Sequence, residues 1–173
     1  MAKKLKILIF PDPRLRKVAV KVKKFDKSLQ KLADDMFLTM YDANGIGLAA
    51  TQVNEHIRLI VMDLSEERND PKIFINPEYK VLEGHNLFEY EEGCLSIPGF
   101  NEKISRPDKI ELKWQDINGK EHITVPEGLL TVCIQHEIDH LDGILFIDHL
   151  SSLKRKMAVQ KIKKLKKKEN TNE

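Results

Sequence analysis

Long apolar runs and cysteines are both scarce in this sequence of 173 residues. No stretch approaches the roughly 18 consecutive apolar residues of a membrane helix, so we expect no membrane-spanning helix. The first apolar run, residues 7–10, is short and no small-residue cleavage site follows it, so we expect no secretory signal. These absences predict a cytoplasmic protein. Its two cysteines, Cys94 and Cys133, are then better explained as a ligand, a nucleophile or core than as a disulfide.

Charge is unevenly distributed along the chain. Residues 151–173 carry nine Lys or Arg and two Glu, whereas residues 1–150 carry 20 basic and 25 acidic residues. A basic tail on an acidic body favours a tail that binds nucleic acid or another anionic surface. The length suits one domain. We therefore expect residues 1–150 to form the main part and residues 151–173 to add a basic helix and tail to the same single domain.

Three segments have the periodicity of α-helices. Apolar residues recur at steps of three and four over about 28–43, and Asn44-Gly45 supplies a stop. A second helix is expected at about 127–141, and it should be buried because apolar residues cover most of its circumference. A third is expected at about 152–167, and only the last residues, KKKENTNE, look disordered. The apolar side of this third helix holds Leu153, Met157, Ile162 and Leu165.

Between the first two helices the pattern favours short strands. The apolar runs lie at 59–62, 73–75, 110–114 and 123–125. Their close spacing without intervening helices implies mostly antiparallel pairing, and residues 116–119 are a predicted hairpin turn. Residues 5–10 should form a short strand or an extended arm. We expect an α+β fold, with antiparallel sheets packed around the central buried helix and with a C-terminal helix.

The buried helix carries an HExxH motif that begins at His136 and ends at His140. Residues four apart on a helix share a face, so two imidazoles can bind one metal ion while Glu137 reaches its water. Two core histidines satisfied by hydrogen bonds are the alternative. Burying both His and the Glu on an apolar helix would be costly without a ligand, however. The motif therefore favours a metalloenzyme.

The third ligand decides the class of metalloenzyme. In the metzincin pattern a further histidine would stand where Phe146 is, so that class is excluded. Cys133 lies three residues before His136. Because helical Cβ atoms tilt toward the N-terminus, its sulfur should point away from the metal, and we assign it to the core or the pocket wall. Cys94 remains, and one Cys with two His leaves a fourth position open, as in catalytic sites.

Three motifs together resemble those of the peptide deformylases. They are GIGLAATQ at 45–52, EGCLS at 92–96 and QHEIDHLDG at 135–143, in matching order and separation. The likeness extends from the PDPRLR stretch at residue 11 into the tail. It implies a bacterial-type, iron-dependent hydrolase whose catalytic domain spans residues 1–150. Such an enzyme removes the N-formyl group from the N-terminal formyl-methionine of new polypeptides and releases formate.

The resemblance also implies roles for individual residues. The metal ligands would be Cys94, His136 and His140, holding Fe(II), for which Ni, Co or Zn could substitute. Glu137 would be the general base, and the side-chain amide of Gln52 and the backbone amide of Leu95 would stabilise the oxyanion. The substrate-binding residues would be Gly45, Ile46, Gly47, Glu92, Leu129, Val132 and Cys133. The apolar members of this set are also ordinary core residues.

The expected partners are N-formylmethionyl nascent peptides and, through the basic tail, the ribosome; no membrane partner is expected. Two other functions stay open. A general metallopeptidase shares HExxH but would not need Cys94. A nucleic-acid-binding protein with a structural metal would explain the basic tail, although a solvated helix face explains it too. Asp139 could support a metal ligand or lie exposed on its helix.

Overall fold

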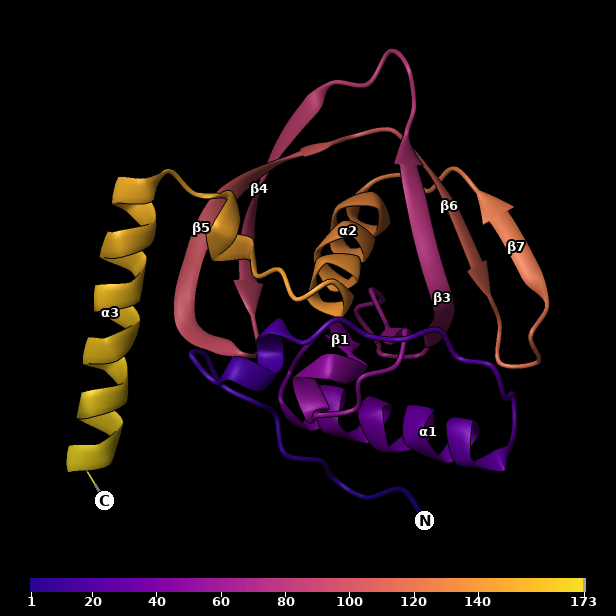
Figure 1. Ribbon diagram of the computed structural model, residues 1–173, viewed down its shortest axis with the longest axis horizontal. Helices are drawn as coiled ribbons and strands as arrows, with labels where there is room; N and C mark the ends of the chain where they lie inside the picture. The colour runs from indigo at the N-terminus through magenta and orange to yellow at the C-terminus, as the bar shows by residue number, and fades with distance from the viewer. Residues whose placement is uncertain (173) are drawn as a thin grey trace.

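The computed structural model describes residues 1–172, and its centre is helix α2 (Leu129–Leu141). Figure 1 shows α2 between two layers, with β4 and β5 on one side and β3 and β6 on the other. Every residue of α2 from Thr131 to Leu141 is buried. Burial on all sides suits a helix whose apolar residues cover most of its circumference. The expected α+β fold with antiparallel sheets around a buried HExxH helix is confirmed.

Within residues 1–172, five antiparallel strands form a sheet in the order β1-β2-β3-β6-β7. They are β1 (Gly47–Ala49), β2 (Leu59–Met62), β3 (Lys72–Val81), β6 (Ile110–Gln115) and β7 (Glu121–Thr124). All four predicted apolar runs fall in this sheet. The predicted hairpin turn joins β6 to β7, where the Gly119 amide donates to the Asp116 carbonyl.

Both faces of β2 are buried, which explains its unbroken apolar sequence. Ile60 and Met62 share a hydrophobic cluster with α2, whereas Leu59 and Val61 share one with helix α1 (Lys27–Asp42). Successive side chains of a strand point to opposite faces. The two helices therefore cover opposite faces of this sheet.

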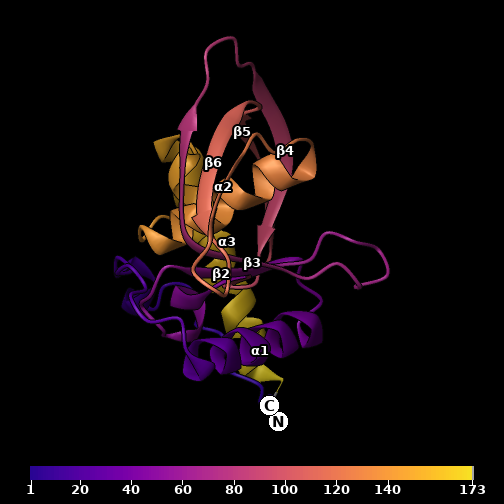
Figure 2. The ribbon, with the colours of Figure 1, turned by 90° about the vertical axis from the view of Figure 1, so that its right-hand side faces the viewer.

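The predicted first helix is confirmed as α1. The carboxylate of its N-cap, Asp26, accepts hydrogen bonds from the amides of Ser28 and Leu29. Asn44, at φ 56°, ends the segment in the left-handed conformation that this residue type tolerates. Figure 2 shows α1 lying across the base of the molecule, below α2.

Strands β4 (Leu87–Cys94) and β5 (Ile97–Pro107) pair antiparallel in a second sheet, which covers the other side of α2 (Figure 1). The sequence pattern predicts neither strand. Charged residues such as Glu89 and Glu91 interrupt β4, and Pro98-Gly99 interrupts β5, so neither contains an apolar run. Contacts between their inward side chains and α2, rather than a local apolar pattern, account for these two strands.

The N-terminal residues 5–10 form an extended arm outside any strand, which was one of the two predicted alternatives. The Leu8 amide donates to the Gln52 carbonyl, and the Phe10 amide donates to the Ser96 carbonyl. The arm therefore ties the segment that carries Gln52 to the end of the β4–β5 hairpin. Short 3₁₀ helices complete the fold: η1 (Pro13–Arg16), η2 (Ala50–Val53) and η3 (Phe146–His149).

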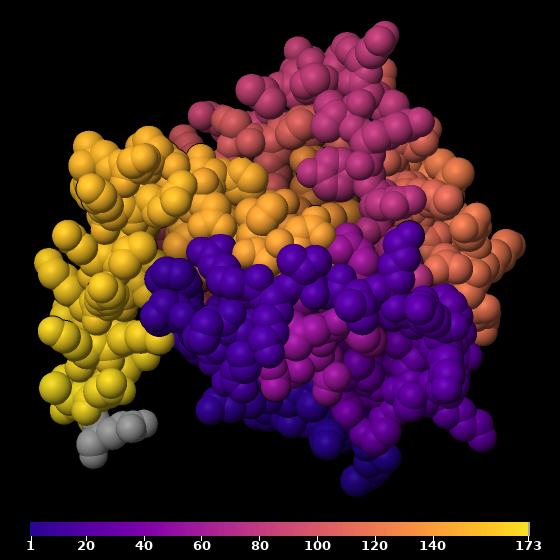
Figure 3. Space-filling view, in the orientation of Figure 1, coloured from indigo at the N-terminus to yellow at the C-terminus, as the bar shows by residue number. Residues whose placement is uncertain are grey.

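Helix α3 (Ser152–Thr171) lies along the outer side of β5 and forms one edge of the molecule (Figures 1 and 3). The sequence pattern predicts its end at Lys167 and disorder in the last residues. That expectation is wrong up to Thr171, where the helix ends, and Glu173 lies outside the described residues. No helix within residues 1–172 combines the length and the apolar composition needed to cross a membrane.

The buried side of α3 differs from the predicted one. Ala158 and Ile162 join a hydrophobic cluster that also contains Phe146. Leu153 and Met157, predicted on the same side as Ile162, are instead 70% and 61% exposed. Residues 153 and 157 lie about one turn apart, but 162 is five positions further on, which turns it to another face.

Gly143 ends α2 as predicted, and it offers a test of this turn. It has φ +74°, and a Cβ here would lie 2.5 Å from the carbonyl oxygen of Arg16. Gly84 has φ +75°, but a Cβ there would meet nothing within 4 Å. We expect Gly84→Ala to cost about 1–2 kcal/mol for its backbone conformation, and Gly143→Ala clearly more because Arg16 must also move. Urea denaturation measures both, and equal losses would contradict the role of the Arg16 contact.

Candidate metal centre and active site

Cys94, His136 and His140 meet in one place although they come from two separate elements. Cys94 ends β4, and the two histidines lie one turn apart on α2. The Cys94 Sγ lies 3.2 Å from His140 Nε2, and potential ligand atoms of all three lie within 4.8 Å of one another. One sulfur and two imidazole nitrogens suit a divalent transition metal and leave a position open. The structure thus brings together the three predicted ligands.

Burial influences the protonation of these groups. It lowers the pKa of His140, which favours the neutral imidazole that binds metals. Burial acts in the same direction on His136, but hydrogen bonds to Cys94 and Glu92 outweigh it and raise its pKa. Burial also raises the pKa of Cys133 to about 12. Cys133 is therefore a thiol, which fits its predicted place in the pocket wall.

Glu137 borders the same place. Its Oε2 is buried and has no hydrogen-bond partner among the described residues. Burial raises the pKa of Glu137 to about 7. Gly47 of β1 makes room for the carboxylate, since a Cβ there would lie 2.6 Å from Glu137 Oε1. A carboxylate oxygen without a partner, on a group that titrates near neutral pH, is suited to accept a proton from water.

Both donors predicted to stabilise an oxyanion also border the site. The Oε1 of Gln52 accepts a hydrogen bond from the Ala49 amide at 2.9 Å. This contact turns Nε2 toward Ser96 Oγ at 3.1 Å and Cys94 Sγ at 3.6 Å. Leu95 follows Cys94 and lines the same cavity. The side-chain amide of Gln52 therefore presents its donor beside the candidate ligands.

A cavity of about 470 Å³ opens beside the ligands. Its walls include most of the residues predicted to bind the substrate, to bind the metal or to take part in catalysis. They are Gly45, Ile46, Gly47, Gln52, Glu92, Cys94, Leu95, Val132, Cys133, His136 and Glu137. Tyr90 of β4, which no sequence pattern singled out, lines it as well. Leu129 does not. It borders a second cavity of about 240 Å³, which shares Tyr90 and Val132 with the first.

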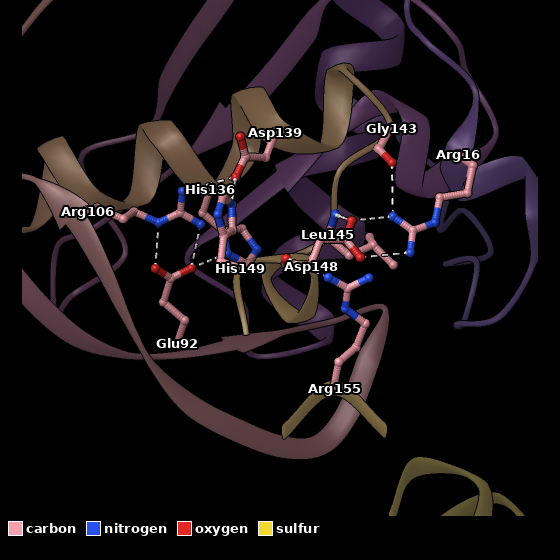
Figure 4. Close-up of polar contacts among 10 residues, drawn as sticks. All are labelled: Arg16, Glu92, Arg106, His136, Asp139, Gly143, Leu145, Asp148, His149 and Arg155. Atoms are coloured by element: carbon pink, nitrogen blue, oxygen red, sulfur yellow. Dashed lines mark hydrogen bonds and ion pairs between the residues drawn. The ribbon is translucent and has the colours of Figure 1, made fainter. Parts of the chain in front are cut away.

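Arg106 of β5 joins two buried carboxylates behind the site (Figure 4). Its Nε and Nη2 donate to Glu92 at 2.6 and 2.9 Å, and its Nη1 donates to Asp139 at 3.0 Å. Glu92 also lies 2.7 Å from His136 Nδ1. Asp139 lies 2.8 Å from Nε2 of His149. Burial alone would raise the pKa of Glu92, but the hydrogen bonds from Arg106 and His136 outweigh it and lower that pKa.

These contacts bear on two of the sequence expectations. Glu92, predicted to bind substrate, lines the cavity but engages both carboxylate oxygens with Arg106 and His136. Asp139 is buried and paired, so the alternative of an exposed carboxylate is wrong. Arg106 and His149 could not be found from the sequence, because neither belongs to a local motif.

Phe146 occupies the sequence position at which the metzincin pattern has its third histidine. Its ring stacks on that of His136, with 6.0 Å between the centroids. Nearby, Arg16 pairs with Asp148 and donates to the Gly143 carbonyl, as Figure 4 shows. This ion pair anchors the segment after α2, which leads to α3.

Comparison with known proteins gives one consistent result. A family model described as polypeptide deformylase matches residues 4–156. A peptide deformylase of Stutzerimonas stutzeri is 56% identical over 161 residues, which are 93% of this chain and 95% of that protein. One of Pseudomonas aeruginosa is 55% identical over 92% of this chain and 95% of that protein.

Solved structures agree with this result. The crystal structure of a peptide deformylase from Legionella pneumophila has a TM-score of 0.89 and 47% identity, and the match covers 96% of this chain and 98% of that chain. A peptide deformylase from Ehrlichia chaffeensis, solved in complex with actinonin, has a TM-score of 0.86 and 42% identity, over 94% of this chain and 97% of that one. The chain belongs to the polypeptide deformylase family, the hydrolases that remove the N-formyl group from newly made polypeptides.

Proposed function

We propose that the protein performs this hydrolysis with a metal ion held by Cys94, His136 and His140, and that the physiological ion is Fe(II), with Ni, Co or Zn as substitutes. The main support is that these three residues lie close together, and that two of them, Cys94 and His136, border one cavity with Glu137, which has an unpartnered carboxylate oxygen. Thiolate and imidazole ligands suit all of these ions. When bound, the ion supplies the Lewis acidity that lowers the pKa of a water ligand toward neutrality.

The remaining tasks fall to residues of this chain. Glu137 takes a proton from the attacking water and later returns it to the departing amine nitrogen. Gln52 Nε2 and the backbone amide of Leu95 donate hydrogen bonds to the formyl oxygen as negative charge develops on it. Glu92 accepts from Nδ1 of His136 and so sets the orientation of that ring. Formate and a polypeptide with a free amino terminus are released.

In this proposal the substrate is the N-terminal formyl-methionine of a nascent polypeptide. The methionine side chain lies against Ile46, Val132 and Cys133, the apolar part of the cavity wall. The peptide continues past Gly45 and Gly47, where the absence of side chains lets another backbone approach. Because such peptides are made in the cytoplasm, we place the protein there.

We also propose that α3 docks the protein on the ribosome. The segment 151–173 holds nine basic and two acidic residues, and its lysines other than the half-buried Lys166 lie on exposed positions of the helix. Only Ala158 and Ile162 are buried among the residues of α3 that the structure describes, so most of the helix surface is free for a partner. An RNA surface attracts such a cationic helix strongly.

Glu137→Gln should keep the metal and lose turnover, because an amide cannot accept the proton. We expect formate release from formyl-Met-Ala-Ser by anaerobically purified protein to fall about 100- to 10,000-fold. Glu127→Gln, at an exposed position just before α2, should match the wild type in turnover and metal content. Turnover retained by Glu137→Gln would exclude Glu137 as the base. Cleavage of internal peptide bonds without formate release would favour a general metallopeptidase.

The two cysteines give a matched test of metal binding. Cys94→Ala should lower metal affinity by more than about 100-fold, since changes beyond the direct ligands already cost about 10- to 100-fold. Cys133→Ala should retain the metal, because its buried thiol is not a ligand. Metal content is measured after dialysis against a chelator. Metal retained by Cys94→Ala would refute the ligand assignment.

Ribosome docking is tested by charge reversal on α3. Deleting residues 154–173 would uncover the cluster around Phe146, so replacing exposed side chains is the cleaner test. The test variant is Lys163→Glu, Lys164→Glu and Lys167→Glu combined. It should co-sediment less with ribosomes, and the salt slope should fall by about one for each lysine that contacts phosphate.

The matched control carries the same change of charge elsewhere, at exposed positions before and in α1. It is Lys23→Glu, Lys24→Glu and Lys27→Glu combined. Both variants should hydrolyse formyl-Met-Ala-Ser as the wild type does. Unchanged sedimentation of the α3 variant, or an equal loss in the control, would reject docking through α3.

A further inference from the structure

Residues of β4 and of α2 line both cavities, and we call the space of the two cavities together the groove. Alternate residues of a strand face the same side, and Phe88, Tyr90 and Glu92 form such an alternate series among the β4 residues that line the cavities. Leu129, Val132 and His136, about one turn apart, are among the α2 residues that line the cavities. In both series the residue number rises toward the candidate metal ligands. The groove therefore runs from the metal site toward the N-terminal end of α2.

Tyr90 and Val132 form the boundary between the cavities, because each lines both of them. Glu92 and His136 line only the larger cavity, of about 470 Å³. Phe88 lines only the smaller one, of about 240 Å³. Tyr90 has a larger side chain than Val132, so we take its ring as the main barrier between the two cavities.

Packing alone holds Tyr90 in this position. Its hydroxyl makes no hydrogen bond to any residue in the described part of the chain, and the residue is only half-buried. The smaller cavity behind it has mainly apolar walls, including Phe88 and Leu129, with the carboxylate of Asp108 among its lining groups. Asp108 already accepts a hydrogen bond from the Asn86 amide at 2.7 Å. The space behind Tyr90 is therefore suited to an apolar chain.

We propose that Tyr90 is a specificity-determining residue that limits the length of the substrate side chain by closing the larger cavity toward the smaller one. This rests on the proposed function, in which the larger cavity receives methionine. Without the tyrosine ring the two cavities form one longer groove. That groove accepts formyl peptides whose first residue has an unbranched apolar side chain longer than methionine, because Phe88 and Leu129 can bury the additional methylene groups.

The test compares formate release from formyl-Met-Ala-Ser with release from a peptide whose first residue carries an unbranched eight-carbon side chain. The measured quantity is the ratio of kcat/KM for the long substrate to kcat/KM for the methionine substrate. This ratio should rise at least about tenfold in Tyr90→Val, since one methylene group in a pocket changes discrimination by about 10-fold or more. Valine retains the β propensity that β4 needs. Tyr90→Leu serves the same comparison should Tyr90→Val fail to fold.

Three further variants identify the cause of such a rise. Tyr90→Phe keeps the ring and should keep the wild-type ratio. Leu129→Trp added to Tyr90→Val fills the smaller cavity and should restore a low ratio. Leu87→Ala lies on the opposite face of β4, where Leu87 is 68% exposed, and should leave the ratio unchanged.

The outcomes separate this inference from the function on which it rests. The inference is overturned by an unchanged ratio in a folded Tyr90→Val or Tyr90→Leu variant that still acts on formyl-Met-Ala-Ser. A wild-type protein that accepts both substrates equally overturns it as well. Absence of formate release from formyl-Met-Ala-Ser by the metal-loaded wild type would instead overturn the proposed function.

Discussion

The ion pairs of Arg106 with Glu92 and Asp139 hold together the elements on which the site depends. Each of these buried charges loses several kcal/mol of solvation, so they are tolerated only as a fully hydrogen-bonded set. The three residues belong to β5, β4 and α2. They therefore fasten the strand that ends in Cys94 to the helix that carries the two histidines, and the distance between the candidate ligands follows from this arrangement.

Glu92, one of these three residues, also orients one candidate metal ligand directly. Glu92 accepts from Nδ1 of His136, which leaves the other ring nitrogen for the metal site. Asp139 lies three residues after His136, and so on a neighbouring part of the helix surface. His149, with 39% of its side chain exposed, is the point where the set reaches solvent. The surrounding strands thus supply charged partners for two residues of the buried motif, His136 and Asp139, whereas Glu137 keeps an unpartnered oxygen.

In the two proposals above, chemistry and specificity occupy different ends of one groove. Strand β4 and helix α2 both lead toward the ligands, so side chains further from the metal come from earlier positions in each element. Glu137 and Gln52 border the end where the proposed reaction of the formyl group takes place, whereas Tyr90 and Val132 line both cavities, where the proposed limit on side-chain length acts. Substitutions at the two ends should consequently affect turnover and substrate choice separately.

The sequence by itself determined the parts of this protein that depend on local spacing. Residues four apart placed His136 and His140 on one helix face, and the continuous apolar composition of that helix required its burial. The first helix, four strands of the larger sheet, the hairpin turn and the family motifs were predictable in the same way. All three candidate ligands were also predictable from the sequence. The helical spacing indicated the two histidines, and Cys94 remained as the third ligand once Cys133, on the helix, was assigned to the core or the pocket wall.

Only the tertiary structure decided which side chains surround that helix. Strands β4 and β5 lack apolar runs because exposed residues such as Glu89, Glu91 and Pro98 interrupt them, and no spacing along the chain connects Arg106 or Tyr90 to α2. The exposure of Leu153 and Met157 likewise depends on which face of α3 meets β5. Contacts between segments far apart in the sequence depend on long-range pairing, and local periodicity carries no information about it.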